Sequence, residues 1–416
     1  MSLDKLLGGI RGYGHYIFII TAALSTYSLI YTFSEGFGIL AHNWYNSYSL
    51  QAYSWLQGRL DIPEDRPWLE IAFFGGRNYI SFPPFPSMVL LPFVAVFGTE
   101  TPDHAIAMVC ALVSLIFAYK IAFKHLNNKD YAAFFSLFLI LGTNYLHLSL
   151  WGAVWWLAQN MAFMFTLMAF YLAMSDDRRH SYIALFAFCA AMGCRPFNAV
   201  YLPLLLYMLY KREGLRLAPY TKKLLVYAVP AIMLGCVFMW LNYARFGSVF
   251  EFGHNYLPEF VWDYHGQFHF SRMARNLTMI FLGTDIAYGI RNGFPFYGRT
   301  SFAFWLASPI VISYVVYLCI YAARKKDGTG EPAIWMIPLM VMLHILAFSL
   351  HRTLGGRQFG SRYAADSLPA IYLGLVLMLA RLPLNNRVYL NLAPLIFGKM
   401  INFHGTIMFL TFYFGE

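Results

Sequence analysis

Two carboxylates stand close to arginines in a polar stretch of an otherwise apolar chain. Asp61 ends the sequence Gly-Arg-Leu-Asp and follows Arg59 by two residues. Glu70 lies a few residues before Arg77, in a stretch that continues through Tyr79 to a cluster of prolines. A carboxylate can act as a general base that takes the proton from an acceptor hydroxyl, and the planar guanidinium fork of arginine matches phosphate oxygens. Together these residue types suit a transfer reaction in which a phosphate leaves.

Further polar residues extend this set beyond the first stretch. Arg195 stands in a Gly-Cys-Arg-Pro turn between two short apolar segments, and Gln159 lies beside a group of tryptophans. Glu251 and His254 belong to a second polar stretch, which is rich in aromatic residues. The predicted catalytic residues are Asp61 and Glu70, and the predicted substrate-binding residues are Arg59, Arg77, Tyr79, Gln159, Arg195, Glu251, His254, Arg352, Arg357 and Arg362.

Each of these residues also has a structural interpretation. A single surface carboxylate is more often solvated or paired with a nearby arginine than catalytic. The arginines can equally pair with acidic side chains or with lipid head groups. Tryptophans near Gln159 are typical of the aromatic belt at a membrane surface. Which interpretation holds depends on whether the candidates converge in space.

One pair of histidines has the spacing of a metal site. His265 and His269 are four residues apart, so on a helix they would share a face, and Asp263 lies nearby. Acceptor binding, or histidines that form hydrogen bonds among interfacial aromatic residues, explains the same pattern. We therefore predict no metal cofactor, with a divalent metal at this pair as the alternative.

The composition indicates that these residues are positioned by a membrane protein. Of the 416 residues, 59% are hydrophobic and 12% charged, against about 25% charged in an average soluble domain. The first apolar run, residues 16 to 33, has no small-residue cleavage site after it, so we expect an uncleaved helix. We predict an all-α polytopic membrane protein, one domain over residues 1–416, with about ten or eleven transmembrane helices. Further stretches begin near residues 105, 131, 154, 224, 302, 334, 368 and 388, with a shorter pair at 182–193 and 197–210.

The positions of the basic residues predict the topology. The segment 85–98 is short and contains prolines, and counting it as a span would place Lys120, Lys124 and Lys129 outside. An in-plane helix there makes every inner connection basic, which also accounts for the net charge of +10 without nucleic acid. The N-terminus is then cytoplasmic. The inner connections hold Lys120, Lys124, Lys129, Arg178, Arg179, Lys211, Arg212, Arg216, Lys222, Lys223, Arg324, Lys325, Lys326, Arg381 and Arg387.

Three outer connections have a different basic composition. Residues 34–102, 244–299 and 351–363 hold eleven of the twenty arginines and none of the ten lysines. Orientation alone explains few basic residues outside, but it does not explain a set made only of arginine. We therefore predict that these loops form an active-site face for a phosphate-bearing substrate.

The first outer loop resembles a family of membrane enzymes. A carboxylate followed by GRxYxxFPPxP and LLPFxxxFG, after AYSWLQGRLDI, resembles bacterial glycosyltransferases of the GT-C class, such as protein O-mannosyltransferases and lipid A aminoarabinose transferases. The resemblance implies inverting transfer of a sugar from a polyprenyl-phosphate donor to a lipid or glycan acceptor, at the outer face of a bacterial inner membrane. It also implies a first-loop acid as the base. Relatives carry an acidic pair soon after the first helix, where this chain has His42-Asn43-Trp44-Tyr45, so Asp61 and Glu70 are the substitutes.

Two other classes of function compete with this one. A transporter or flippase for lipid-linked sugars needs a polar path across the bilayer, often between two related halves. The chain shows no convincing internal repeat, and its polar residues gather at one face. A structural subunit of an envelope complex would leave the outer arginines without a phosphate to bind. The sequence therefore favours surface chemistry over transport.

Overall fold

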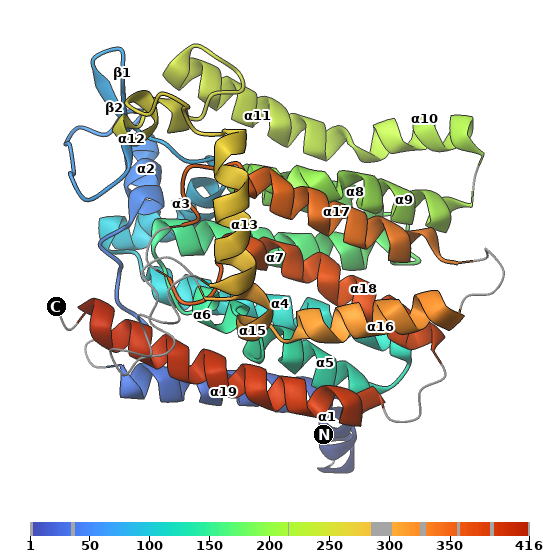
Figure 1. Cartoon of the computed structure of the whole chain (residues 1–416). Helices are drawn as coiled ribbons and strands as arrows, with labels where there is room; N and C mark the ends of the chain where they lie inside the picture. Colours follow the sequence, from blue (N-terminus) through green and yellow to red (C-terminus); the bar gives the residue numbers. More distant parts are fainter. Residues whose placement is uncertain are drawn as a thin grey trace.

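Long helices lie side by side along a common direction in the computed structural model of the chain (Figure 1). The structure describes residues 3–34, 38–214, 216–283, 302–324, 330–355, 358–382 and 387–414. Within these residues, six helical segments are long and apolar enough to cross a membrane. They belong to α1 (Leu3–Phe33), α4 (Asp103–Leu126), α7 (Val154–Ala173), α11 (Val229–Phe246), α17 (Pro332–Ser349), and the 3-10 turn η5 (Tyr363–Ser367) joined to α18 (Leu368–Arg381).

The remaining predicted apolar stretches are helical as well, although most are shorter. Each stretch predicted as a span contains a helix in the described chain, so the all-α membrane class is confirmed. The predicted ten or eleven helices are reached only when the shorter ones are counted. The shorter helices are α5 (Lys129–Leu141), α8 (His180–Cys194), η2 (Pro196–Tyr201), α9 (Leu202–Glu213), α10 (Leu217–Tyr227), α15 (Phe304–Ala307) and α16 (Ile310–Arg324), and the last predicted stretch forms the longer helix α19 (Arg387–Phe414).

Local sequence sets the tight reversal between α4 and α5. Asn127 ends α4 with a left-handed backbone, φ 48°, which asparagine tolerates better than most residues. Asn128 follows as the N-cap of α5, and its side chain accepts a hydrogen bond from the Tyr131 N–H. Two consecutive asparagines therefore turn the chain and return it antiparallel.

Polar contacts gather the predicted inner connections at one end of the bundle, which we call the basic end. His15 of α1 lies 2.9 Å from Asp130, and Lys124 lies 3.2 Å from Asp176. Glu331, which precedes α17, binds both Lys211 and Arg381. Connections far apart in sequence therefore meet at this end.

The opposite end, which we call the loop end, holds the elements of the predicted outer connections. The Asn46 amide donates to the Thr99 carbonyl, so the first connection starts and finishes at this end. The segment predicted as an in-plane helix forms α3 without inverting the topology. Helix α13 (Met273–Leu282) lies across the bundle direction (Figure 1). The other elements at this end are α2 (Ser47–Leu56), β1 (Ile71–Phe74), β2 (Arg77–Ile80), α3 (Phe85–Phe97), η1 (Gly98–Glu100), α6 (Tyr145–Ser149), η3 (His254–Tyr256), α12 (Pro258–Val261) and η4 (Phe270–Arg272).

A short β-hairpin interrupts the otherwise helical architecture. Strands β1 and β2 pair antiparallel, with Phe74 opposite Arg77, and the turn consists of Gly75 and Gly76 at φ 57° and 77°. Two consecutive positive φ angles suit the tight hairpin turns whose twist matches the strands, and glycine adopts them without strain. The hairpin was not expected in an all-α fold; it fixes the backbone directly after Glu70.

Helix α18 is the most enclosed of the candidate spans. Almost all of its residues are buried, whereas only 28% of the residues are buried in the candidate spans of α1 and α11. The Tyr372 hydroxyl donates to the Ala118 carbonyl of α4 at 2.8 Å, and Gly374 leaves room for the Tyr314 ring of α16. Helix α18 therefore lies in the centre of the core, and its first residues lie at the loop end.

Candidate active site

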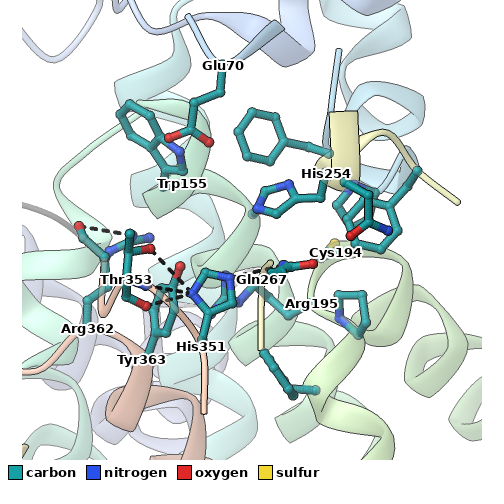
Figure 2. Close-up of a pocket in the computed structure, with 18 of the residues that line it drawn as sticks. Glu70, Trp155, Cys194, Arg195, His254, Gln267, His351, Thr353, Arg362 and Tyr363 are labelled. Atoms are coloured by element: carbon teal, nitrogen blue, oxygen red, sulfur yellow. Dashed lines mark hydrogen bonds between the residues drawn. The ribbon is translucent and has the colours of Figure 1, made fainter. Parts of the chain in front are cut away.

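A cavity of about 560 Å³ lies at the loop end, where the predicted outer connections meet. This volume falls within the usual range for small-molecule sites. Aromatic side chains form much of its wall, and carboxylates, arginines and imidazoles face the same space (Figure 2). Its polar lining consists of Glu70, Arg195, Glu251, His254, Asn255, Glu259, Gln267, His351, Thr353 and Arg362.

Arg362 is the buried cation of this cavity, with 2% of its surface exposed. Its Nη2 donates to the Gly355 carbonyl at 3.2 Å, and the guanidinium lies 5.1 Å from the ring centres of Trp156 and Tyr363. Among the described residues, Nε and Nη1 have no hydrogen-bond partner and no carboxylate pairs with the side chain. Buried cations are normally paired, so two unused donors on a buried guanidinium beside the cavity indicate an anion-binding position.

Hydrogen bonds also fix the backbone of Arg362. Its N–H donates to Gln358 Oε1 at 2.8 Å, and its carbonyl accepts from the amide of Gln159. Gln159 does not line the cavity itself. In the structure, Gln159 supports the backbone of Arg362, and its predicted contact with substrate stays a prediction.

Arg195 lines the same cavity but is neutralised. It stands between α8 and η2, and its Nε and Nη2 donate to one oxygen of Asp366 at 3.0 and 2.9 Å. Its guanidinium also lies 4.7 Å from the centre of the Tyr363 ring. Asp366 accepts a further hydrogen bond from Gln159. The two arginines thus differ, since Arg195 has a carboxylate partner and Arg362 has none in the described chain.

Glu70 faces this pair from the first outer loop, beside Trp155 (Figure 2). Burial raises the pKa of Glu70 to about 7, because the charged carboxylate loses water. A hydrogen bond with Trp155 opposes this rise, the Glu259 charge adds to it, and Arg362 lowers it. A carboxylate with a pKa near 7 accepts a proton at neutral pH and binds it strongly enough for general-base catalysis.

Two neutral histidines stand between the second and third connections. The Nδ1–H of His254 donates to the Ser81 carbonyl at 2.8 Å, which leaves Nε2 as an acceptor. The Gln267 amide donates to His351 Nε2 at 3.0 Å. Burial lowers the pKa of His254 and lowers that of His351 to about 3. Both rings therefore present neutral polar groups to the cavity at physiological pH.

Several predicted residues lie outside the cavity. Asp61 pairs with Arg59 at 2.7 Å, and this hydrogen bond lowers the pKa of Asp61, so it is a weak base. Arg77 is exposed on the hairpin, and Tyr79 packs against Phe246. These four residues do not join Glu70 in the lining.

The other predicted residues from the second and third connections have separate environments. Arg352 binds Asp263 at 2.8 Å and lies 3.6 Å from Glu259, and it does not line the cavity. Glu251 does line it, but its oxygens accept from the Gly253 N–H and from the Asn255 amide and so brace the loop. Arg357 lies outside the described residues.

The predicted alternative of a metal at His265 and His269 is not supported by the local contacts. The two rings stack at 3.8 Å, and His269 Nδ1 lies 2.7 Å from the Ser271 hydroxyl. Asp263 is engaged by Arg352 and by Arg272. In the described part of the chain, no group of three or more His, Cys, Asp or Glu side chains is placed to hold a metal ion.

The structure adds residues that the sequence did not single out. Asp366 lies four residues after Arg362, a helical spacing, and an acid at the start of an apolar stretch was a usable signal. Glu259 and His351 gave no such signal, and Trp156 was attributed to an aromatic belt, because aromatic and polar residues are common at a membrane surface. Only the tertiary fold brings them to one cavity.

The arrangement of the helices is shared with a solved membrane enzyme. The structure is similar to that of ArnT from Cupriavidus metallidurans in the apo state, with a TM-score of 0.51 and 16% sequence identity over 91% of this chain and 62% of ArnT. The chain has the GT-C glycosyltransferase fold. The family resemblance predicted from the first outer loop is thereby confirmed at the level of the fold.

Two further solved structures resemble this GT-C fold less closely. ArnT bound to undecaprenyl phosphate matches with a TM-score of 0.48 and 15% identity, over 91% of this chain and 62% of that one. The oligosaccharyltransferase of Archaeoglobus fulgidus in the apo form gives 0.49 and 13%, over 95% and 56%. The chain therefore spans less than two thirds of the length of the GT-C proteins it resembles. No family model and no curated protein sequence matches it.

Proposed function

We propose that the chain is a membrane glycosyltransferase that moves a sugar from a polyprenyl-phosphate donor to an acceptor hydroxyl. The observation that carries the proposal is the pairing, in one cavity, of an arginine with two unused donors and a carboxylate with a pKa near 7. The GT-C fold agrees with a transferase of this kind.

In the proposed reaction, Nε and Nη1 of Arg362 bind the donor phosphate. Glu70 takes the proton of the acceptor hydroxyl as that oxygen bonds to the anomeric carbon of the sugar. The bond from this carbon to the phosphate oxygen breaks at the same time, and its electron pair leaves with the phosphate. The polyprenyl phosphate stays on Arg362, whose charge stabilises the developing negative charge. Attack opposite the leaving group inverts the anomeric carbon.

Arg195 and the histidines have supporting roles in this proposal. Arg195, which is paired with Asp366, holds the Tyr363 ring that packs beside Arg362. The free Nε2 of His254 accepts a hydrogen bond from a sugar or acceptor hydroxyl. We assign the acceptor to the lipid or glycan class, since the cavity offers both aromatic walls and hydroxyl-binding groups.

We also propose the orientation of the protein in a bacterial inner membrane. The basic end, with Lys124 and Lys211, faces the cytoplasm together with the N-terminus, because lysine and arginine are retained on that side. The loop end and its cavity then face outward, as a single active-site face of one membrane domain. No metal cofactor takes part in the proposed reaction.

Binding of a defined donor tests the proposal. The protein in nanodiscs is mixed with undecaprenyl-phosphate hexoses and pentoses, and bound lipid is detected by native mass spectrometry. We expect a stoichiometric complex that weakens at least tenfold in Arg362→Ala. Arg275→Ala, an exposed arginine of α13, serves as the matched control and retains binding.

Two results would contradict the proposal. Equal binding by the Arg362 and Arg275 variants would remove the assignment of the phosphate site. Movement of labelled donor across a vesicle bilayer without sugar transfer to any supplied acceptor would instead favour the alternative, a transporter or flippase for lipid-linked sugars.

A further inference from the structure

The Arg362 guanidinium occupies space that any side chain at residue 355 would fill. Gly355 lines the cavity beside it. A Cβ built on Gly355 would lie 2.7 Å from Nη2, 2.9 Å from Nε and 3.1 Å from Cζ of Arg362. Contacts below 3.0 Å are shorter than van der Waals packing permits, so even alanine would force the guanidinium to move.

The backbone of Gly355 serves the same guanidinium directly. Its carbonyl accepts the hydrogen bond from Nη2 at 3.2 Å. Its φ of 105° lies in a region that residues with a Cβ rarely adopt. The backbone of Gly355 therefore supplies a carbonyl acceptor for Nη2 of Arg362, and the lack of a side chain at Gly355 leaves space for the guanidinium.

Arg362 has little freedom to give way. The rings of Trp156 and Tyr363 each lie 5.1 Å from its Cζ, and Gln358 and Gln159 fix its backbone. A displaced guanidinium would lose these contacts. The displacement would also move Nε, which has no hydrogen-bond partner among the described residues. Nε is one of the atoms closest to the position of a Cβ at residue 355.

We infer that Gly355 is a positioning residue of the anion site, which holds the guanidinium of Arg362 in the place where it binds a lipid-linked phosphate. The inference rests on the proposed function, because it assigns the phosphate as the ligand of Arg362. It adds to that proposal a residue of the same outer connection as Arg362, one that has no side chain of its own.

A double-mutant cycle with full-length protein in nanodiscs tests this role, with undecaprenyl phosphate as the probe. Gly355→Ala is expected to weaken binding about tenfold or more, because it misplaces the guanidinium. Arg362→Lys keeps the charge but replaces the rigid planar guanidinium by a flexible Cε–Nζ end, which lacks Nη2 and can rotate away from the new methyl group. Adding Gly355→Ala to Arg362→Lys is therefore expected to change binding less than threefold.

A second glycine with a positive φ controls for the general effect of adding a methyl group at such a position. Gly214 at the basic end also has a positive φ, 60°, but has no atom within 4 Å of a built Cβ. Gly214→Ala is expected to bind the probe like the wild type, and thermal unfolding of each variant reports any loss of folding.

The outcomes distinguish the inference from the proposed function. Wild-type affinity in Gly355→Ala, or the same tenfold loss in the lysine background, would overturn the positioning role while leaving the phosphate site in place. Absence of binding by the wild type would instead refute the proposed function itself. A loss confined to folded Gly355→Ala, and absent from the lysine background, supports the inference.

Discussion

Glu70 and Arg362 face one cavity from opposite parts of the chain, and the charge of the arginine acts on the ionisation of the carboxylate. Glu70 precedes the hairpin of the first outer connection, whereas Arg362 precedes the enclosed helix α18. Burial raises the pKa of Glu70 while Arg362 lowers it, and the balance lies near 7. A donor phosphate on Arg362 and a base at Glu70 would thus lie within one space.

Replacement of Glu70 by glutamine tests the base. The amide has nearly the same shape but does not accept a proton, so sugar transfer is expected to fall by about two to four orders of magnitude. Donor binding is expected to stay near the wild-type value. Transfer is measured as release of polyprenyl phosphate in the presence of acceptor.

Two other carboxylates of the same loop provide the comparison. Glu64→Gln removes an exposed acid and is expected to leave transfer unchanged. Asp61→Asn separates the two catalytic predictions, because Asp61 pairs with Arg59 outside the cavity. If Asp61→Asn lost transfer while Glu70→Gln kept it, the choice of Glu70 would be wrong.

The pH dependence follows from the raised pKa of Glu70. Only the unprotonated carboxylate can act as the base, so kcat/KM is expected to be low at pH 5, half-maximal near pH 7 and constant above it. Glu259→Gln removes a charge that raises the pKa of Glu70, so the midpoint should move to lower pH. Rates measured from pH 5 to 9 check both points. A profile that is flat over this range would exclude Glu70 as the titrating base.

The buried pair of Arg195 and Asp366 is expected to matter for stability. Asp366→Asn leaves Arg195 charged without its partner in an almost buried position, and loss of one member of such a pair costs about 3–5 kcal/mol. Thermal unfolding in detergent should report this loss. Glu100→Gln is a suitable comparison, since it removes an exposed acid paired with His42, where pairs contribute at most about 1 kcal/mol. Equal shifts in both variants would show that the buried pair has no special weight.

Arg245 offers a test of the hairpin's position. Its Nη1 donates to the Ile80 carbonyl at 3.1 Å, which ties α11 to β2 next to the strand that follows Glu70. Arg245→Met keeps much of the volume and removes this bond, so transfer is expected to fall about tenfold through a displaced Glu70. Donor binding at Arg362 should change little. A parallel loss of donor binding would indicate a general disturbance instead.

The helices could be predicted from sequence because the bilayer imposes the pattern. In the hydrocarbon core of a bilayer, backbone groups must form hydrogen bonds within the chain, so a spanning segment is a long apolar helix. The apolar runs of α4 and α7 could therefore be recognised in the sequence, and the basic residues indicated which ends lie on the same side. The α3 segment was predicted to be a helix that does not cross the bundle, because counting it as a span would have inverted the positions of Lys120, Lys124 and Lys129, and both of its ends do lie at the loop end. Both signals, the apolar run and the basic residues beside it, lie within short stretches of sequence and need no knowledge of contacts between distant residues.

The site was predictable only in part, because it depends on contacts between distant loops. Glu70 and Asp61 have similar surroundings in sequence, and only the fold shows that one faces the cavity while the other pairs with Arg59. Arg362 was found through the bias toward arginine in the outer connections. Gln159 was found as well, but its contact is with Arg362 rather than with the cavity. Gly355 was not found, because its inferred role depends on having no side chain, and a search for reactive or charged side chains does not detect such a residue.

The enclosure of α18 has a consequence for the timing of events in the site. Arg362 and Asp366 are attached to α18, the most buried of the candidate spans in the described chain, while Glu70 is attached to a two-stranded hairpin at the edge of the molecule (Figure 1). Backbone amides in a buried helix exchange with solvent far more slowly than those of a small peripheral hairpin. The phosphate position is therefore expected to persist while the base moves toward and away from it. On this view, entry and release of acceptor are local fluctuations of residues 57–82, and they need no rearrangement of the helices that hold the donor.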